Sequence, residues 1–250
     1  MDAALDAKVA DIAPHLIPGL IVDRGCGTGA MMSAFARGNR KVVGIEISDA
    51  LSHNHAGVIQ ADIIEPVFAN GFVENIVLSS VMHEVYSYND YRLEPVRRCL
   101  QTCALELSPG GRVIIRDIWS PEGNAGDIEL TLDVESWDRL SDLSDRTPMP
   151  LEITARDPTR RAVQMSMRTA VEFLAKRDYV HHWDLEIREV YTALPLSTYR
   201  TLAADLGLDV VVAEPIRNRW IIDNRWRRNI EGNVPEFTNQ LIVLEKPVAR

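Results

Sequence analysis

The feature that most constrains this chain is a short apolar run that ends in a glycine-rich turn. Leu20–Asp23 is apolar up to its final carboxylate, and the residues that follow give the pattern Asp23-x-Gly25-x-Gly27-x-Gly29. A short apolar run followed by glycines is typical of a buried strand. Glycine adopts backbone conformations that other residues avoid and lets a ligand approach the main chain closely. The turn therefore predicts an α/β sheet with a ligand site at the carboxyl edge of its first strand.

The rest of the chain supports an alternation of strands and helices. Apolar residues recur at helical spacing from Leu5 to Leu16, and further helices are predicted over 30–37, over 91–107 and from Ser197 to Leu206. Further strands are predicted at Lys41–Ile47, Gly57–Gln60, Asn75–Ser79, Arg112–Ile118, Leu208–Glu214 and Asn239–Glu245. Buried strands that alternate with helices indicate a mainly parallel, open sheet covered on both faces. A length of 250 residues suits a single domain of this class.

Residues 119–195 interrupt this alternation. A stretch of this length is rarely a plain loop, so we expect an inserted cap with two or more helices. Asp157-Pro158 has the residue types of a helix cap and first turn, and the apolar residues from Val163 to Leu174 would line that helix. Leu185–Val190 has the composition of a strand.

Composition argues against several classes of protein. The chain has 27 basic and 36 acidic residues, a net charge of −9 that disfavours binding to double-stranded nucleic acid. No apolar stretch approaches the roughly 18 residues of a membrane span, and the first residues do not have the pattern of a secretory signal. Three cysteines, Cys26, Cys99 and Cys103, form no evident disulfide framework. We therefore expect a cytoplasmic protein, as a monomer or a homodimer, without a membrane partner.

Acidic residues at two predicted strand ends narrow the choice of ligand. Glu46 ends the second strand, where a carboxylate can accept hydrogen bonds from both hydroxyls of a ribose. Asp62 follows the third strand beside Ile63, although an aspartate in a loop also commonly caps a turn. The alternating glycines differ from the G-x-G-x-x-G pattern of nicotinamide-binding enzymes.

Together these positions resemble the class I, Rossmann-like S-adenosylmethionine-dependent methyltransferases. Asp23–Gly29 matches the first motif of that family, Glu46 its acidic position after strand two, and Asp62-Ile63 its adenine-contact pair. Ile76–Ser80 resembles its fourth strand, and Pro109–Gly111 the turn before its fifth. The resemblance covers about residues 15–118 and 196–246. It implies a doubly wound seven-stranded sheet in the order 3-2-1-4-5-7-6, with strand 7 antiparallel and the cap inserted after strand 5.

The resemblance also implies the residues of the site. The cofactor would be S-adenosyl-L-methionine, and the residues expected to bind it are Asp23, Gly25, Cys26, Gly27, Gly29, Glu46, Ile47, Asp62, Ile63 and Ser79. One position departs from the family pattern: Arg24 replaces an apolar residue. Because side chains alternate along a strand, Arg24 should point away from Asp23, toward the first helix or a partner chain.

The acceptor of the methyl group should lie after strand four. His83 is the candidate catalytic base, although methyl transfer requires a base only when the acceptor starts protonated. Candidate substrate-binding residues are Tyr86, Trp119, Glu189 and Tyr191. Tyr86, like Tyr88, could instead be a helix-surface aromatic, and Glu186 and Glu189 could be paired surface charges. Within the cap, Met165, Met167, Trp137 and Trp183 would offer contacts to an apolar acceptor.

Two other clusters admit simpler explanations. His181 and His182 would point in opposite directions on an extended chain, so no metal site is expected. The arginines and tryptophans of 217–228 could grip an anionic partner, but a solvated hairpin with its tryptophans on the core is favoured.

The predicted function is methylation of an O, N or C atom of a small molecule or a modified peptide. The alternatives are a non-catalytic S-adenosylmethionine-binding domain of a larger assembly and, less favoured, an NAD-dependent oxidoreductase.

Overall fold

Seven strands form the main sheet in the order β3-β2-β1-β4-β5-β11-β9, in a computed structural model that describes residues 3–37, 40–52, 56–123 and 125–248. They are β1 (Ile21–Arg24), β2 (Val42–Glu46), β3 (Val58–Gln60), β4 (Val73–Ser79), β5 (Leu107–Ile118), β9 (Asp209–Ile216) and β11 (Asn239–Glu245). Only β11 runs antiparallel to its neighbours, β5 and β9. The predicted fold class, strand order and antiparallel strand are confirmed.

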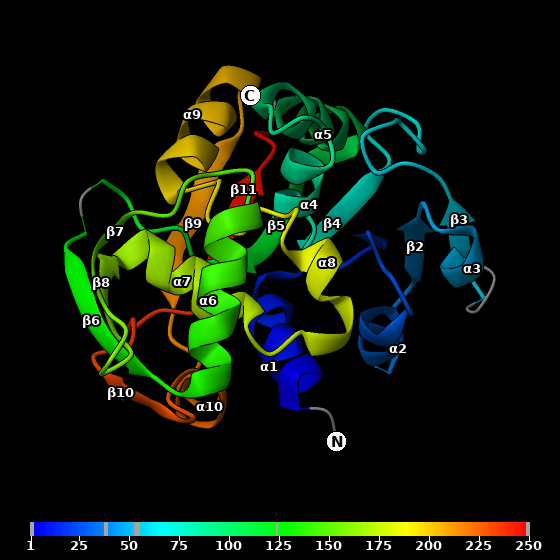
Figure 1. Cartoon of the computed structure of the whole chain (residues 1–250). Coiled ribbons are helices and arrows are strands. Elements are labelled where there is room, and N and C mark those ends of the chain that lie inside the picture. The colour runs from blue at the N-terminus through cyan, green and yellow to red at the C-terminus, as the bar shows by residue number, and fades with distance from the viewer. Residues whose placement is uncertain (1–2, 38–39, 53–55, 124, 249–250) are drawn as a thin grey trace.

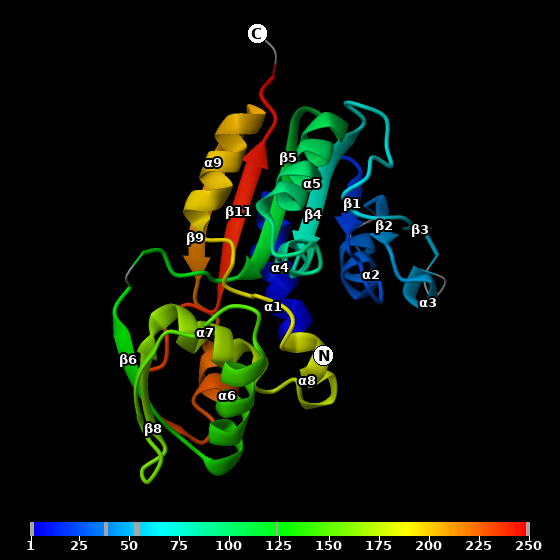
Figure 2. The ribbon, with the colours of Figure 1, turned by 45° about the horizontal axis from the view of Figure 1, so that its top comes forward.

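Helices cover both faces of this sheet (Figures 1 and 2). Ile76 and Leu78 of β4 face α4 (Met82–Ser87), α5 (Leu93–Glu106) and α9 (Leu196–Leu206). Val77, between them, faces α1 (Ala3–Ile12) and α2 (Ala30–Ala36). This alternation is the period-2 pattern expected of a strand buried on both faces. The short helices η1 (Ala13–His15) and α3 (Asp49–Ser52) complete the first half of the chain.

Arg24 points to α5, and not to the first helix or to a partner chain as predicted. Its buried guanidinium pairs with the equally buried carboxylate of Glu106 and donates to the carbonyl of Ile63. Glu106 also accepts hydrogen bonds from the backbone N–H groups of Val67 (2.6 Å) and Phe68 (3.0 Å). The pair therefore fastens α5 to the loop that follows β3.

A second lobe lies beside the carboxyl edge of β5 and contains its own antiparallel sheet, in the order β10-β6-β8-β7 (Figure 2). Its strands are β6 (Asp127–Leu132), β7 (Ile153–Asp157), β8 (Ala162–Ser166) and β10 (Ile230–Gly232). Two helices, α6 (Val134–Arg146) and α7 (Met167–Lys176), share a hydrophobic core with this sheet. The predicted helices are present, but the sheet was not predicted.

Several local predictions for this lobe are wrong. Asp157-Pro158 starts a β-turn, where one carboxylate oxygen of Asp157 accepts from the N–H groups of Thr159 (3.0 Å) and Arg160 (3.1 Å). The helix begins ten residues later, at Met167. Met165 is fully buried, so it belongs to the core of the lobe and not to an exposed contact surface.

The strap between α7 and α9 contains no strand at Leu185–Val190. It forms η2 (Val180–His182) and α8 (Trp183–Glu186), and then continues through turns. The segment after β9 is also not a hairpin. It forms α10 (Arg219–Ile221), the π-helix η3 (Ile222–Trp226) and then β10. Trp226 is buried in the core of the second lobe, whereas Trp220 is 48% exposed.

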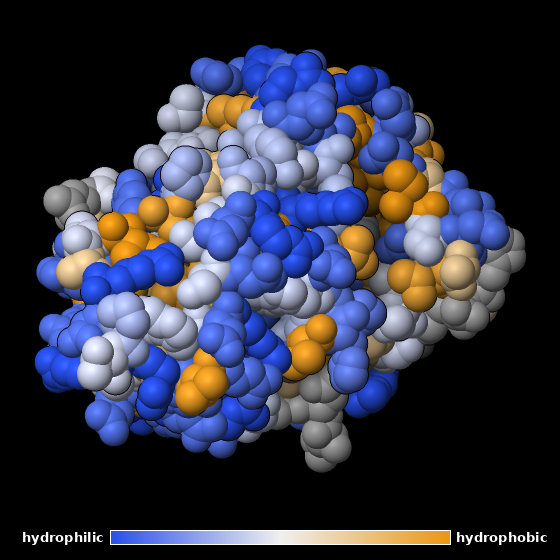
Figure 3. All heavy atoms as spheres, in the orientation of Figure 1, coloured by the Kyte–Doolittle hydropathy of each residue, from blue (hydrophilic) through white to orange (hydrophobic). Residues whose placement is uncertain are grey.

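The surface on the side shown in Figure 3 is mainly hydrophilic, and its hydrophobic side chains lie in small groups separated by hydrophilic ones. Among the described residues, no helix combines the length and the apolar character needed to cross a membrane.

Candidate functional site

The glycine-rich turn between β1 and α2 has the backbone that its sequence predicts. Gly25, Gly27 and Gly29 have φ angles of +76°, +52° and +74°, in the left-handed region that favours glycine. A Cβ atom on Gly25 would lie 2.7 Å from Cγ2 of Val81, so this glycine also allows close packing. A Cβ atom on Gly27 would meet nothing within 4 Å, because it would point into open space.

That open space is a cavity of about 330 Å³ at the carboxyl ends of β1 and β4. Five of the predicted cofactor-binding residues line it: Asp23, Gly25, Cys26, Gly27 and Ser79. Helix α1 contributes Ala4, Leu5 and Lys8 to the wall, and α2 contributes Ala30 and Met31. The described part of α1 thus forms one side of the cavity opposite the glycine turn.

Glu46 holds the glycine turn in place. Its side chain is buried, and its two oxygens accept hydrogen bonds from the backbone N–H groups of Gly27 and Ser48, both at 2.9 Å. A carboxylate oxygen has two lone pairs, so each oxygen can accept a further bond from a ligand hydroxyl.

The remaining predicted cofactor residues lie outside the cavity. Asp62 accepts a hydrogen bond from the N–H of Ile64 (2.9 Å), the turn-capping role that was its alternative. Ile63 is buried in the main core, whereas Ile47 is 64% exposed after the end of β2. Gly29 begins α2. The roles of Ile47, Asp62 and Ile63 toward an adenine ring therefore stay predictions.

Asp23 is the most strongly perturbed carboxyl in this cavity. Burial raises its pKa to about 7, against the opposing effect of Lys8. Burial also lowers the pKa of Lys8, with a further contribution from Arg116. A cationic ligand in the cavity would place a positive charge near the carboxyl of Asp23 and would favour its ionised form.

A second cavity, of about 250 Å³, adjoins the first. The two share Ala4 and Lys8 of α1 and Ser80, which follows β4 with a φ angle of +57°. The second lobe and the strap supply most of the remaining wall: Ala175, Tyr179, Glu186, Glu189, Tyr191, Asn218, Ile221, Arg225 and Trp226. The main domain adds His83, Glu84, Arg116, Ile118, Thr238 and Asn239.

His83 lies in this second cavity between two carboxylates. Its Nδ1 is 2.6 Å from Oδ1 of Asp117, and its Nε2 is 3.4 Å from Oε2 of Glu189. The backbone N–H of His83 also donates to Asp117 (3.1 Å). Burial opposes a charge on the imidazole, but Asp117, with a smaller contribution from Glu189, holds the pKa of His83 well above its ordinary value. Burial raises the pKa of the adjacent Glu84 to about 7.

Glu189 is held against α4 by contacts on both sides of it. Its Oε1 accepts from the hydroxyl of Tyr88 (2.7 Å), and the N–H of Val190 donates to Ser87 (2.8 Å). Lys176 of α7 donates to the backbone carbonyl of Glu189. These bonds fix the strap where it crosses the cavity.

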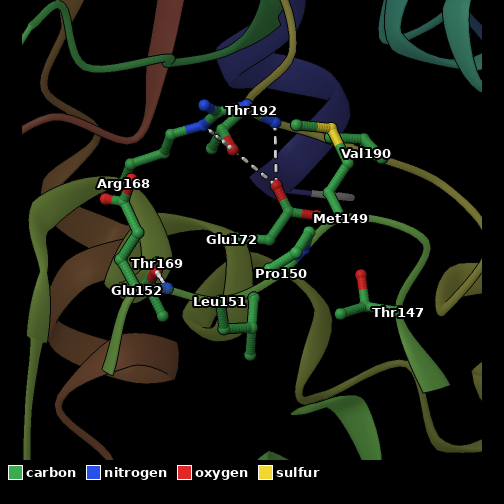
Figure 4. Close-up of a pocket in the computed structure, with 10 residues that line it drawn as sticks. All are labelled: Thr147, Met149, Pro150, Leu151, Glu152, Arg168, Thr169, Glu172, Val190 and Thr192. Carbon is green, nitrogen blue, oxygen red and sulfur yellow. Dashed lines mark hydrogen bonds between the residues drawn. The ribbon is translucent and has the colours of Figure 1, made fainter. Parts of the chain in front are cut away.

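Glu172 of α7 anchors the next residues of the strap. It is paired with Lys176 (2.7 Å), and its carboxylate accepts from the N–H groups of Tyr191 (3.1 Å) and Thr192 (2.8 Å). Figure 4 shows Glu172 directed at Thr192, next to a small cavity of about 30 Å³ in the second lobe. The buried Glu172–Lys176 pair thus positions Tyr191, whose ring lies edge-on to His83 at 4.6 Å.

The structure brings together only some of the predicted acceptor residues. His83, Glu189 and Tyr191 line the second cavity. Tyr86 packs against the main core and Tyr91, and Trp119 packs against Phe237. Sequence reasoning missed Asp117, although its place at the end of the fifth strand was a usable signal. It also missed Lys8, for which the sequence alone held no signal. For Arg225 a solvated hairpin was favoured, and the structure places it in the wall of the second cavity.

Comparisons with known proteins agree with this arrangement. Residues 22–115 match the model of a methyltransferase domain. No curated protein sequence matches the chain. Its fold is similar to that of an S-adenosylmethionine-dependent methyltransferase from Methanosarcina mazei, with 12% identity, a TM-score of 0.54, and 95% of this chain and 97% of the other covered.

Two further solved structures share the fold. A Mesorhizobium loti S-adenosylmethionine-dependent methyltransferase has 16% identity, a TM-score of 0.55, and 97% and 95% of the two chains covered. The Burkholderia thailandensis 1,6-didemethyltoxoflavin-N1-methyltransferase, solved with 1,6-didemethyltoxoflavin and S-adenosylhomocysteine, has 10% identity, a TM-score of 0.53, and 98% and 79% covered. The matched domain includes the glycine turn, Glu46 and Asp62, and the sheet has the order and the antiparallel strand expected of the family. Residues 22–115 therefore match a methyltransferase domain, and the whole chain has the fold of S-adenosylmethionine-dependent methyltransferases.

Proposed function

We propose that this chain transfers the methyl group of S-adenosylmethionine to a small molecule held in the cavity next to His83. One observation carries the proposal: the two cavities meet at Ala4, Lys8 and Ser80. A cofactor bound at the glycine turn would direct its sulfonium methyl toward the cavity that the second lobe closes. Methyl transfer requires in-line alignment of the acceptor and exclusion of water, and an adjoining cavity between the main domain and the second lobe would serve both requirements.

The cofactor would lie along the turn. Its ribose hydroxyls would donate to Glu46, and its positively charged methionyl part would lie near Asp23, whose buried carboxyl gains an opposite charge. The adenine would lie near Ile47 and Asp62, outside the turn.

The second cavity favours a small acceptor. Its volume of about 250 Å³ is at the small end of ligand pockets, and its wall combines aromatic side chains with a larger number of charged and titratable ones. The Burkholderia thailandensis relative, which binds 1,6-didemethyltoxoflavin, supports a small molecule over a peptide. Because the second lobe and the strap form half of the wall, we expect residues 119–195, together with the segment before β11, to determine which acceptor binds.

His83 is the candidate for direct action on the acceptor. Against the effect of burial, Asp117 and Glu189 hold the pKa of His83 well above its ordinary value, which favours the imidazolium, and an imidazolium cannot accept another proton. His83 therefore serves as a base only after it has lost the proton on Nε2.

Calorimetry and turnover together test the proposal. We expect S-adenosylhomocysteine to bind with one site per chain and NAD not to bind. Incubation of S-adenosylmethionine with pools of small molecules should release S-adenosylhomocysteine for at least one pool. Binding without turnover on any small molecule or peptide would favour a non-catalytic domain. Binding of NAD alone would contradict the proposal.

Hydrogen exchange tests the role of the second lobe. With S-adenosylhomocysteine present, addition of the acceptor should increase protection in the strap around Glu189 and in α10. Protection confined to the edge of the main sheet would show that the lobe does not contact the acceptor.

A further inference from the structure

Three metal-ligating side chains converge on the wall of the second cavity. They are His83 and Glu84 of α4 and Glu189 of the strap, and one donor atom of each lies within 4.8 Å of the others. His83 and Glu189 are buried, and Glu84 is partly buried. The cluster combines one imidazole nitrogen with two carboxylates, a donor set that suits divalent transition metals such as Mn²⁺, Fe²⁺ and Zn²⁺.

The spacing of two of these atoms fits ligands of a shared ion. Nε2 of His83 and Oε2 of Glu189 are 3.4 Å apart. A charge-assisted hydrogen bond between such groups is normally about 2.7–2.9 Å long. Two ligands of a tetrahedral ion, each bonded at about 2.0–2.1 Å, lie about 3.4 Å apart. The observed distance is therefore long for a direct hydrogen bond and correct for two ligands.

Neighbouring side chains orient His83 and Glu189 in the way that the residues around a metal site orient its ligands. A histidine that binds a metal usually donates its other ring N–H to a carboxylate, and Nδ1 of His83 meets Asp117 at 2.6 Å. That contact turns Nε2 toward the cavity. Glu189 is oriented in the same manner, because its other oxygen accepts from Tyr88 (2.7 Å). Among the described residues, the carboxylate of Glu84 has no hydrogen-bond or ion-pair partner, which leaves it available as a ligand.

We propose that His83, Glu84 and Glu189 bind one divalent cation in the acceptor cavity, with Asp117 as the positioning residue of His83. Three protein ligands leave at least one position open, which faces the space assigned to the acceptor. The proposal rests on the proposed function and deepens it. The cation would take the place of the proton on Nε2, so His83 would act on the acceptor through the cation and not as a base. The acceptor would be a molecule with a hydroxyl oxygen that can bind the cation.

The chemistry balances without a further reactant. A bound cation lowers the pKa of a hydroxyl bonded to it, so the acceptor loses its proton to solvent at neutral pH. The oxygen lone pair then forms the O–CH₃ bond as the C–S bond of the sulfonium breaks. The products are a methyl ether and S-adenosylhomocysteine, and the cation is neither oxidised nor reduced.

Metal binding tests the site without any acceptor. The full chain would be stripped with EDTA, dialysed and titrated by calorimetry with Zn²⁺ and, separately, Mn²⁺. We expect one site per chain, and at least tenfold weaker binding for His83→Asn, Glu84→Gln and Glu189→Gln. Asp117→Asn should weaken binding by about 10-fold to 100-fold, as expected for a group that orients a ligand.

Two control variants make the test specific. Glu186→Gln removes another carboxylate of the same cavity and should change the affinity less than about twofold. A variant lacking His181 and His182 should bind as the wild type does. Far-ultraviolet circular dichroism would confirm that each variant is folded, and S-adenosylhomocysteine titrated into the metal-free protein reports the proposed function separately.

Three results would overturn the site. They are no binding of either ion tighter than about 1 mM, unchanged binding in all three ligand variants, or loss of binding only when His181 and His182 are removed. Any of these combined with normal S-adenosylhomocysteine binding would refute the metal site and leave the proposed function standing.

Discussion

Replacement of Asp23 by asparagine should stabilise the ligand-free protein and weaken its binding of cofactor. Asp23 is 2% exposed, and burial raises its pKa to about 7 from an ordinary value of 3.8. Between these two values the folded protein binds more protons at this site than the unfolded chain. Stability therefore falls as the pH rises from about 4 to 7, and the loss is complete above pH 7. Asparagine carries no charge at any pH, so Asp23→Asn removes this loss.

The magnitude follows from the shift. A difference of about three pKa units corresponds to about 4 kcal/mol at pH 8, as an order-of-magnitude upper value. At pH 5 the carboxyl of the folded protein is still protonated, while that of the unfolded chain is largely ionised. Asp23 therefore lowers the free energy of unfolding by about 1.6 kcal/mol at this pH. The stability advantage of Asp23→Asn over the wild type should thus grow by about 2–3 kcal/mol between pH 5 and pH 8.

Urea unfolding of the ligand-free chain at these two pH values measures this difference. Asp209→Asn, at an exposed position of β9, is the matched control and should follow the wild type at both pH values. In parallel, calorimetry should show that Asp23→Asn binds S-adenosylmethionine at least tenfold more weakly. An equal stability difference between Asp23→Asn and the wild type at pH 5 and pH 8 would show that burial does not raise the pKa of Asp23.

Three further predictions concern the glycine turn, its support by Glu46, and the buried pair of Arg24 and Glu106. Glu46→Gln places an N–H₂ group against a backbone N–H donor and removes a charged acceptor, so S-adenosylhomocysteine affinity measured by calorimetry should fall at least tenfold; unchanged affinity would remove Glu46 from the site. Gly25→Ala should lower the melting temperature because its Cβ would meet Val81. Gly27→Ala should weaken cofactor binding more than Gly25→Ala does, because its Cβ would enter the space assigned to the ligand. The reverse ranking of the two affinities would contradict that assignment. Arg24→Met leaves the buried carboxylate of Glu106 without its cation and should lower the free energy of unfolding in urea by about 3–5 kcal/mol. Adding Glu106→Gln to the same chain should restore part of that loss. A loss below about 1 kcal/mol would show that the pair does not hold α5 to the sheet.

The main sheet was predictable from sequence because its signals are local. Each parallel strand is a short apolar run bounded by turn residues, and the segment Asp23–Gly29 needs its glycines for a backbone that is left-handed at three positions. The same local reasoning placed Glu46 at a strand end next to the turn. Its contact with the N–H of Gly27 depends on β1 and β2 lying side by side, which the parallel pairing supplies.

The second lobe was not predictable because its strands find partners far along the chain. β6 pairs with β8 and also with β10, which comes from the segment between the last two strands of the main sheet. Asp157-Pro158 was misread because an aspartate that accepts from the next N–H groups is common to helix caps and to turns. Arg24 was misplaced for a related reason: alternation along a strand gives the face on which a side chain lies, but not the distant carboxylate that it meets.

The candidate acceptor site was also predictable only in part. His83 and Glu189 were identified as separate residues, but nothing in their spacing of more than 100 positions indicates that they meet. Asp117, at the end of β5, orients the ring of His83. Glu172 holds the strap that carries Glu189. Their juxtaposition is a property of the tertiary structure.

We propose that the cofactor cavity opens onto the acceptor cavity where Ala4, Lys8 and Ser80 line both. A crystal structure of the chain with S-adenosylhomocysteine tests it most directly. We expect the ribose hydroxyls on Glu46, the homocysteine between Asp23 and α1, and a sulfur atom that faces His83 and Glu189 past Ser80. A ligand bound away from the glycine turn, or a sulfur atom directed away from the second cavity, would contradict it.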